Sequence, residues 1–270
     1  MDTRQMMTCL PSEMFSMERV RYFTRQLITP DDLTLEQEYF RNKMRRHNRF
    51  LHGWGVVCGC VVRPVVAPGG NNGEPWMVRI TPGYILGPYG DEILIEREVQ
   101  IDLHKESFEG MAANACASPL DPWCSEVVVE RQPGQPLYVA VKYAECKTRP
   151  MRIQAGCACD ETQCEYSRIR DSYAIQVLTE CPDSHSNPPE LDLDELILRE
   201  NPPECLECPQ DPWVVLARVT PGEDGRVTES SIANCDFGNG CYRRMVLSFA
   251  GFWWRCTEPV RPTPPPGNNV

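Results

Sequence analysis

Long apolar runs and the common catalytic motifs are both missing from this 270-residue chain. No stretch of 18 or more apolar residues occurs, so we expect no membrane span. The sequence also lacks a phosphate-binding G-x-x-x-x-G-K-[ST] loop, a dinucleotide-binding G-x-G-x-x-G turn, a zinc-protease H-E-x-x-H pair and a G-x-S-x-G nucleophile elbow. These absences favour a protein that is not an enzyme.

Basic residues and histidines are scarce. The chain has 27 Lys and Arg against 38 Asp and Glu, which gives a net charge of −11. Such a balance argues against the broad basic surface of a nucleic-acid-binding protein. Only four histidines are present, and we interpret each as structural or solvated; they are His47, His52, His104 and His185.

The N-terminal sequence MDTRQMMTCLPSEMF lacks the charged start and apolar core of a secretory signal. It therefore predicts cytoplasmic synthesis. In contrast, 25 prolines and 18 glycines are present, and they indicate many turns between short strands. We predict an α+β protein that is mainly β, with a long N-terminal helix followed by an antiparallel β-sandwich or barrel-like body that carries cysteine-rich loop insertions.

The clearest local signal is a helix that begins after Thr29. Thr29 suits the N-cap, Pro30 the first helical position, and the next two carboxylates the positive end of the helix dipole. Gly53 supplies the stop. Roughly 22 residues at 1.5 Å each give a rod of about 33 Å, which is long for a helix that serves a β domain of this size.

A narrow apolar stripe follows this helix at the helical period, formed by Leu33, Phe40, Met44 and Leu51. One interpretation is that the stripe packs on the protein's own sheet. The other is a helix–helix interface with a partner or a second copy, because a narrow stripe resembles a coiled-coil seam.

Arginines occupy the opposite side of the helix, chiefly Arg41, Arg45 and Arg49. The simplest interpretation is a solvated surface that compensates the helix dipole. The alternative is docking on an acidic neighbour in an oligomer. We include these three arginines with the stripe as candidate interface residues.

Strand-like runs separated by turns occupy most of the remaining chain, among them 137–143, 173–178 and 213–219. The division that we predict is an N-terminal arm at 1–21, the helix segment at 22–53, a β-rich body at 54–256 with a cysteine-rich insertion at 146–208, and a proline-rich tail at 257–270.

Fifteen cysteines are present, an odd number. The densest groups are C-x-C-x4-C and C-x-x-C, whose sulfurs are spaced as in a tetrahedral zinc site. The sequence predicts a structural Zn²⁺ held by Cys157, Cys159, Cys164, Cys205 and Cys208. Disulfides or free thiols remain the alternatives, because the paired spacing of a zinc ribbon is missing.

Three segments resemble known proteins. The run from Tyr22 to Gly59 resembles an uncharacterised bacterial family associated with phage-tail-like contractile injection systems. The runs Val78–Ile93 and Trp213–Thr228 are similar to the strands of phage baseplate and tail-fibre attachment proteins. The resemblance implies a structural subunit of a tail-like particle, which would leave the cell as part of that particle, and it carries over no catalytic residue.

We therefore expect a non-enzymatic building block of a homo- or hetero-oligomeric assembly, with the helix and arm making subunit contacts. Two alternatives belong to other classes. The cysteines at 157–208 are compatible with a metal-binding or redox protein. Trp213, Trp253 and Trp254 are compatible with a glycan- or surface-binding module.

Overall fold

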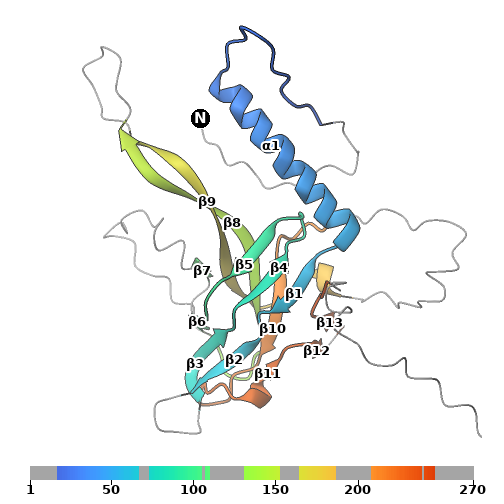
Figure 1. The fold of residues 1–270 in the computed structure, drawn as a ribbon. Helices are drawn as coiled ribbons and strands as arrows, with labels where there is room; N and C mark the ends of the chain where they lie inside the picture. The colour runs from blue at the N-terminus through green and yellow to red at the C-terminus, as the bar shows by residue number, and fades with distance from the viewer. Residues whose placement is uncertain are drawn as a thin grey trace, which may run out of the picture.

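The computed structural model describes residues 17–66, 73–104, 107–109, 131–152, 164–186, 208–238 and 240–246. Within these ranges the chain is mainly β, all strand pairs of its sheets are antiparallel, and one long helix lies near the N-terminus (Figure 1). The coarse fold prediction is confirmed. No sheet of the described ranges closes on itself, so a barrel-like body is not what forms.

Helix α1 spans Pro30–His47 and continues as the π-helical turn η1, Asn48–His52. The Thr29 hydroxyl accepts from the backbone N–H of Asp32, and the Asp32 carboxylate accepts from the N–H of Thr29, so a complete capping box starts the helix. Gly53, at φ +73°, ends η1. The predicted limits of the helix are confirmed.

Two small sheets follow the helix. The first has the order β1–β4–β5, with β1 at Gly55–Gly59, β4 at Gly83–Leu86 and β5 at Glu92–Ile95. The second has the order β2–β3–β6, with β2 at Val62–Val66, β3 at Gly73–Ile80 and β6 at Val99–Asp102.

The largest sheet has the order β11–β10–β8–β9–β7. Its centre is a long hairpin of β8, Leu137–Arg152, and β9, Cys164–Leu178. The flanking strands are β7 at Ser107–Glu109, β10 at Val214–Val219 and β11 at Ile232–Ala233. The short elements that complete the described ranges are η3 at Asp183–His185, η4 at Glu229–Ser231, β12 at Asp236–Gly238 and β13 at Cys241–Tyr242.

The β8–β9 hairpin is longer than the sequence suggested. β8 was expected to end at Tyr143, yet it pairs with β9 as far as Arg152. The hairpin therefore reaches into the stretch predicted as a cysteine-rich insertion. Residues beyond Cys146 on β8 are largely exposed, and so is the facing stretch of β9. A strand that is solvated on both faces has no alternating apolar pattern to reveal it.

One hydrophobic cluster connects the three main sheets. It contains Val56 of β1, Ile93 of β5, Ile101 of β6 and Ile175 of β9, all of them almost completely buried. β5 contacts both β8 and β9, and β1 contacts β10, so the small sheets pack on the large one.

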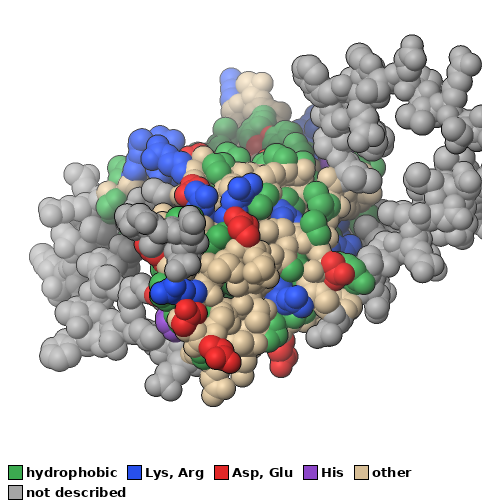
Figure 2. Space-filling model, turned by 90° about the horizontal axis from the view of Figure 1, so that it is seen from below, with side chains coloured by type: hydrophobic (Ala, Val, Ile, Leu, Met, Phe, Trp, Pro, Cys, Tyr) green, Lys and Arg blue, Asp and Glu red, His purple; other side chains and the backbone are tan. Residues whose placement is uncertain are grey.

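Charges of both signs are interspersed on the face of the body opposite the tip of the β8–β9 hairpin, as Figure 2 shows.

None of the helices in the described ranges has the length and apolar character needed to span a bilayer.

Candidate interaction surface

The apolar stripe on α1 is exposed. Leu33 is 52% exposed, Phe40 59%, Met44 54% and Leu51 68%, and α1 has no buried residue. The interpretation that this stripe packs on the protein's own sheet is therefore wrong. Contact with a partner or a second copy stays a prediction.

The arginine side of the helix, instead, faces the body. Arg45 Nε donates to Asp91 Oδ1 at 2.5 Å, and Arg41 Nη1 donates to Glu145 Oε1 at 2.7 Å. Arg49 is only 5% exposed. The interpretation of the arginines as a solvated surface is wrong for Arg45 and Arg49, which are largely buried. Arg41 pairs with Glu145 but stays 36% exposed. A contact of Arg41 with another subunit stays a prediction, whereas Arg45 and Arg49 expose little surface for one.

The helix docks on the tip of the β4–β5 hairpin, residues 87–91, which we call the seat of the helix. Gly90 has φ +86°, and a Cβ atom there would overlap the backbone carbonyl of Arg45. Asn48 Nδ2 also donates to the Gly90 carbonyl at 3.0 Å, and Asn48 is buried. A side chain at position 90 would push the helix away from the hairpin, so glycine is required for this close approach.

A chain of hydrogen bonds continues from the helix into the large sheet. The Tyr143 hydroxyl donates to Asp171 Oδ1 at 2.6 Å and lies 3.3 Å from the Glu145 carboxylate that accepts from Arg41. Burial raises the pKa of Tyr143, and the hydrogen bond to Asp171 adds to that rise. The tyrosine therefore stays protonated and donates. Helix, β8 and β9 are fixed to one another at this point.

Burial also raises the pKa of Asp91, while Arg45 acts in the opposite direction. The Asp91 side chain is only 6% exposed. A carboxylate in such a place needs a cation beside it in order to be tolerated as an anion. The Arg45–Asp91 pair is therefore the innermost anchor of the helix.

Exposed apolar side chains concentrate on the helix and on the turn that precedes it. Of the sixteen large hydrophobic residues that are exposed in the described ranges, ten fall between positions 22 and 51. They are Tyr22, Phe23, Leu27, Ile28, Leu33, Leu35, Phe40, Met44, Phe50 and Leu51. Apolar surface gathered on one element is typical of a contact site for another protein.

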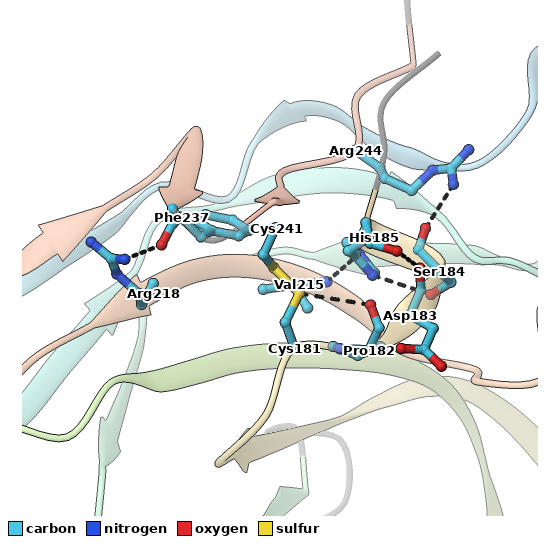
Figure 3. Close-up of a disulfide and its surroundings, with 12 residues drawn as sticks. Cys181, Pro182, Asp183, Ser184, His185, Val215, Arg218, Phe237, Cys241 and Arg244 are labelled. Atoms are coloured by element: carbon cyan, nitrogen blue, oxygen red, sulfur yellow. Dashed lines mark hydrogen bonds between the residues drawn. A yellow bond between two sulfur atoms is a disulfide. The ribbon is translucent and has the colours of Figure 1, made fainter.

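His185 marks the other polar cluster of the body, next to a disulfide (Figure 3). Its Nε2 accepts from the backbone N–H of Val215 at 3.0 Å, so the neutral ring carries its proton on Nδ1, 3.2 Å from the Ser184 hydroxyl. Burial, together with a smaller effect of the Arg244 charge, lowers the pKa of His185 to about 3. This histidine is structural and lacks the pKa of a general base.

Arg244 and Trp54 close the same cluster. The guanidinium of Arg244 lies 4.0 Å from the centre of the Trp54 ring and donates to the Ser184 carbonyl at 2.8 Å. The Trp54 ring meets His185 edge-on at 5.2 Å. Because Trp54 lies immediately after the helical segment, this packing connects the end of η1 to the core of the body.

Cysteines in the described ranges are partly oxidised. Cys181 and Cys241 form a disulfide across 60 residues (Figure 3). Cys146 and Cys208 each take part in a disulfide as well. A cysteine in a disulfide offers no thiolate to zinc. Among the proposed zinc ligands, Cys157, Cys159 and Cys205 lie outside the described residues, and only the backbone of Cys164 is described. The fifth proposed ligand, Cys208, is disulfide-bonded, so its assignment to zinc is wrong. No group of three metal-ligating side chains occurs in the described ranges, and a zinc site on the other four cysteines stays a prediction.

The free cysteines of these ranges are Cys58, Cys60 and Cys235. Burial raises the pKa of Cys60 to about 12, so its thiol is inert at neutral pH. Trp213, one of the tryptophans of the glycan-binding alternative, packs against the core, and Lys142 lies 4.6 Å from its ring centre. Trp253 and Trp254 lie outside the described residues.

A half-open cleft of about 700 Å³ lies between β5 and β9. Its lining mixes carboxylates and guanidinium groups: Tyr84, Glu92, Leu94, Glu96, Arg97, Arg170, Asp171, Ser172 and Tyr173. The Ser172 hydroxyl is buried without a hydrogen-bond partner. Among the described residues that line this cleft, none is a histidine.

The chain matches no protein-family model, and no curated protein sequence is significantly similar to it. A functional proposal therefore depends on how the helix is docked on the body.

Proposed function

We propose that this chain is a non-enzymatic structural subunit of a multimeric assembly, and that α1 is the element by which it joins its neighbours. The single observation that carries the proposal is the orientation of α1. Its arginine side is bonded to the body, while its apolar stripe faces solvent. A helix fixed in this way presents an apolar contact surface with little loss of conformational entropy on binding.

The body supports the same role. We propose that it is a β-sandwich, in which the small sheets pack on the five-stranded sheet through one shared core. The disulfides suit a protein that ends up outside the reducing cytoplasm, as a released particle does. The resemblance of Tyr22–Gly59 to proteins of contractile injection systems narrows the proposal to a baseplate or fibre-attachment subunit of a phage-tail-like particle.

The test is whether assembly depends on the stripe. A tagged copy of the full chain is expressed in the cells that produce it, and large particles are separated from free protein by sedimentation. We expect wild type in the particle fraction and the Phe40→Lys variant in the free fraction, because a charge on the stripe opposes burial in a contact.

Leu35→Lys is the matched control. Position 35 is on the same helix but is turned roughly 200° away from Leu33, and Leu35 is also exposed. We expect this variant to stay in the particle fraction. The proposal is refuted when wild type occurs only as free protein, or when Phe40→Lys enters particles as well as wild type does.

A further inference from the structure

The stripe on α1 shows the same order of apolar and polar positions in both directions along the helix. It can therefore pair with an antiparallel copy of itself, which a general contact surface does not require. Its positions alternate in steps of four and three residues, as in a coiled-coil seam, and they hold Leu33, Gln37, Phe40, Met44, His47 and Leu51. Read in the opposite direction, the same stripe again begins and ends on leucine. Its two polar positions also fall opposite each other.

We propose that the partner of α1 is a second copy of this chain, with the two helices packed antiparallel about a two-fold axis. This inference rests on the proposed function and specifies its contact. When the two stripes are aligned over their full length in opposite directions, Leu33 faces Leu51 of the second copy and Phe40 faces Met44. Gln37 faces His47, so an amide meets an imidazole instead of an apolar side chain. Each pair occurs twice, as a two-fold contact requires.

The charges of α1 favour the antiparallel direction. Its first half is acidic, with Asp31, Asp32, Glu36 and Glu38. Its second half is basic, with Lys43, Arg46 and His47 in addition to Arg45, whose charge is already paired with Asp91. Antiparallel packing sets the acidic half of each helix beside the basic half of the other, and it also opposes the helix dipoles favourably. Parallel packing would instead set the two acidic halves side by side.

The position of the body agrees with the same direction. The bonds from Arg41, Arg45 and Asn48 anchor the C-terminal half of the helix, while the N-terminal half projects away from the sheets (Figure 1). In an antiparallel pair, the projecting half of each helix lies along the anchored half of the other, and the two bodies stay at opposite ends. A parallel pair would bring both bodies to one end.

The expected strength is moderate. Four apolar side chains that are each about half exposed supply only part of the roughly 800 Å² per partner of a standard interface. The exposed residues before the helix, Tyr22, Phe23, Leu27 and Ile28, extend the apolar surface beyond the first turn. We therefore expect a dimer with a dissociation constant on the order of micromolar.

Sedimentation velocity of the purified full chain, from about 1 to about 100 µM, tests the proposal around this dissociation constant. Wild type is expected to shift from monomer to dimer across the range. Leu33→Lys and Leu51→Glu, each alone, are expected to weaken dimerisation by about tenfold or more, because each places a charge opposite a leucine. Leu35→Lys is expected to dimerise like wild type. All three side chains are exposed, so these substitutions are expected to leave the fold intact. Circular dichroism spectra that match wild type will confirm that each variant folds.

The decisive variant carries both Leu33→Lys and Leu51→Glu in one chain. An antiparallel pair then contains two Lys–Glu contacts, so dimerisation is expected to return to within a few-fold of wild type. A parallel pair would contain Lys–Lys and Glu–Glu contacts, which leave the double variant as weak as the single variants or weaker.

The inference is overturned when wild type stays monomeric, or when the double variant is not rescued. Its failure differs from failure of the proposed function. A monomeric wild type that still enters particles, and is lost from them in Phe40→Lys, keeps the structural role and assigns the stripe to a different subunit.

Discussion

The Arg45–Asp91 pair offers the sharpest test of how α1 is held. Asp91 Oδ1 accepts from Arg45 Nε at 2.5 Å, and the two side chains are only 6% and 15% exposed, respectively. Replacing Arg45 by Met keeps an unbranched apolar stem and removes the charged guanidinium. The carboxylate is then left buried without its cation, which typically costs about 3–5 kcal/mol.

The loss should depend on pH, and its sign follows from the pKa of Asp91. Burial raises that pKa in the folded protein, and Arg45 opposes the rise. Without Arg45 the pKa rises further, so the folded state binds a proton more tightly than the unfolded chain does. The free energy of unfolding of Arg45→Met should therefore fall as pH rises from about 4, the ordinary pKa of an aspartate, to neutral. Acid should partly restore it.

Urea denaturation followed by tryptophan fluorescence measures this effect, because Trp54 lies two residues after the end of η1 and is buried. A double-mutant cycle with Asp91→Leu isolates the pair. The double variant has no buried charge at the site and is expected to be more stable than Arg45→Met alone. Single variants within about 1 kcal/mol of wild type, with additive effects, would show that the pair does not anchor the helix.

Three further predictions concern the seat and the core. The pKa of His185 is lowered to about 3, below its ordinary value of 6.5, so the free energy of unfolding should decrease as pH falls from 6.5 toward 3; urea titrations should show a shallower decrease in His185→Gln. Removal of the Cys181–Cys241 disulfide by a double change to alanine should cost about 4 kcal/mol, the loop entropy of its 60-residue separation, and thermal unfolding compared with wild type measures this. Gly90→Ala should destabilise by more than the control Gly134→Ala in the same assay. Both glycines have positive φ, at +86° and +79°, but only the Cβ at 90 meets the carbonyl of Arg45, and equal losses would contradict a tight seat.

Local rules were enough to predict the helix. Thr29, Pro30 and Gly53 act on the few residues around them, and the structure uses each as the sequence indicated. The side on which the helix docks was not predictable in this way. Amphipathic patterns assume that the apolar side faces the core, whereas Arg41 and Arg45 find their partners 104 and 46 residues away.

The other features also divide into those set by neighbouring residues, which could be predicted, and those set by distant contacts, which could not. Strand positions in the body follow from apolar alternation, but the outer part of β8, beyond Cys146, is solvated and shows no such pattern. The partner of Cys181 was equally out of reach, because fifteen cysteines allow very many pairings and spacing alone does not choose among them. The burial of Asp91 at a hairpin tip gave no signal, since a turn aspartate is ordinarily solvated.

The two ion pairs that hold α1, Arg41–Glu145 and Arg45–Asp91, differ in their access to water. The helix can therefore rotate about the less accessible pair. Arg41 and Glu145 are 36% and 26% exposed, so dissolved ions screen their attraction, while the Arg45–Asp91 pair is shielded. In concentrated salt the outer anchor weakens first, and the helix stays seated on Gly90. Its tilt against the body then becomes adjustable without any loss of secondary structure. A neighbour bound to the stripe could meet the body at a range of angles that ionic strength sets.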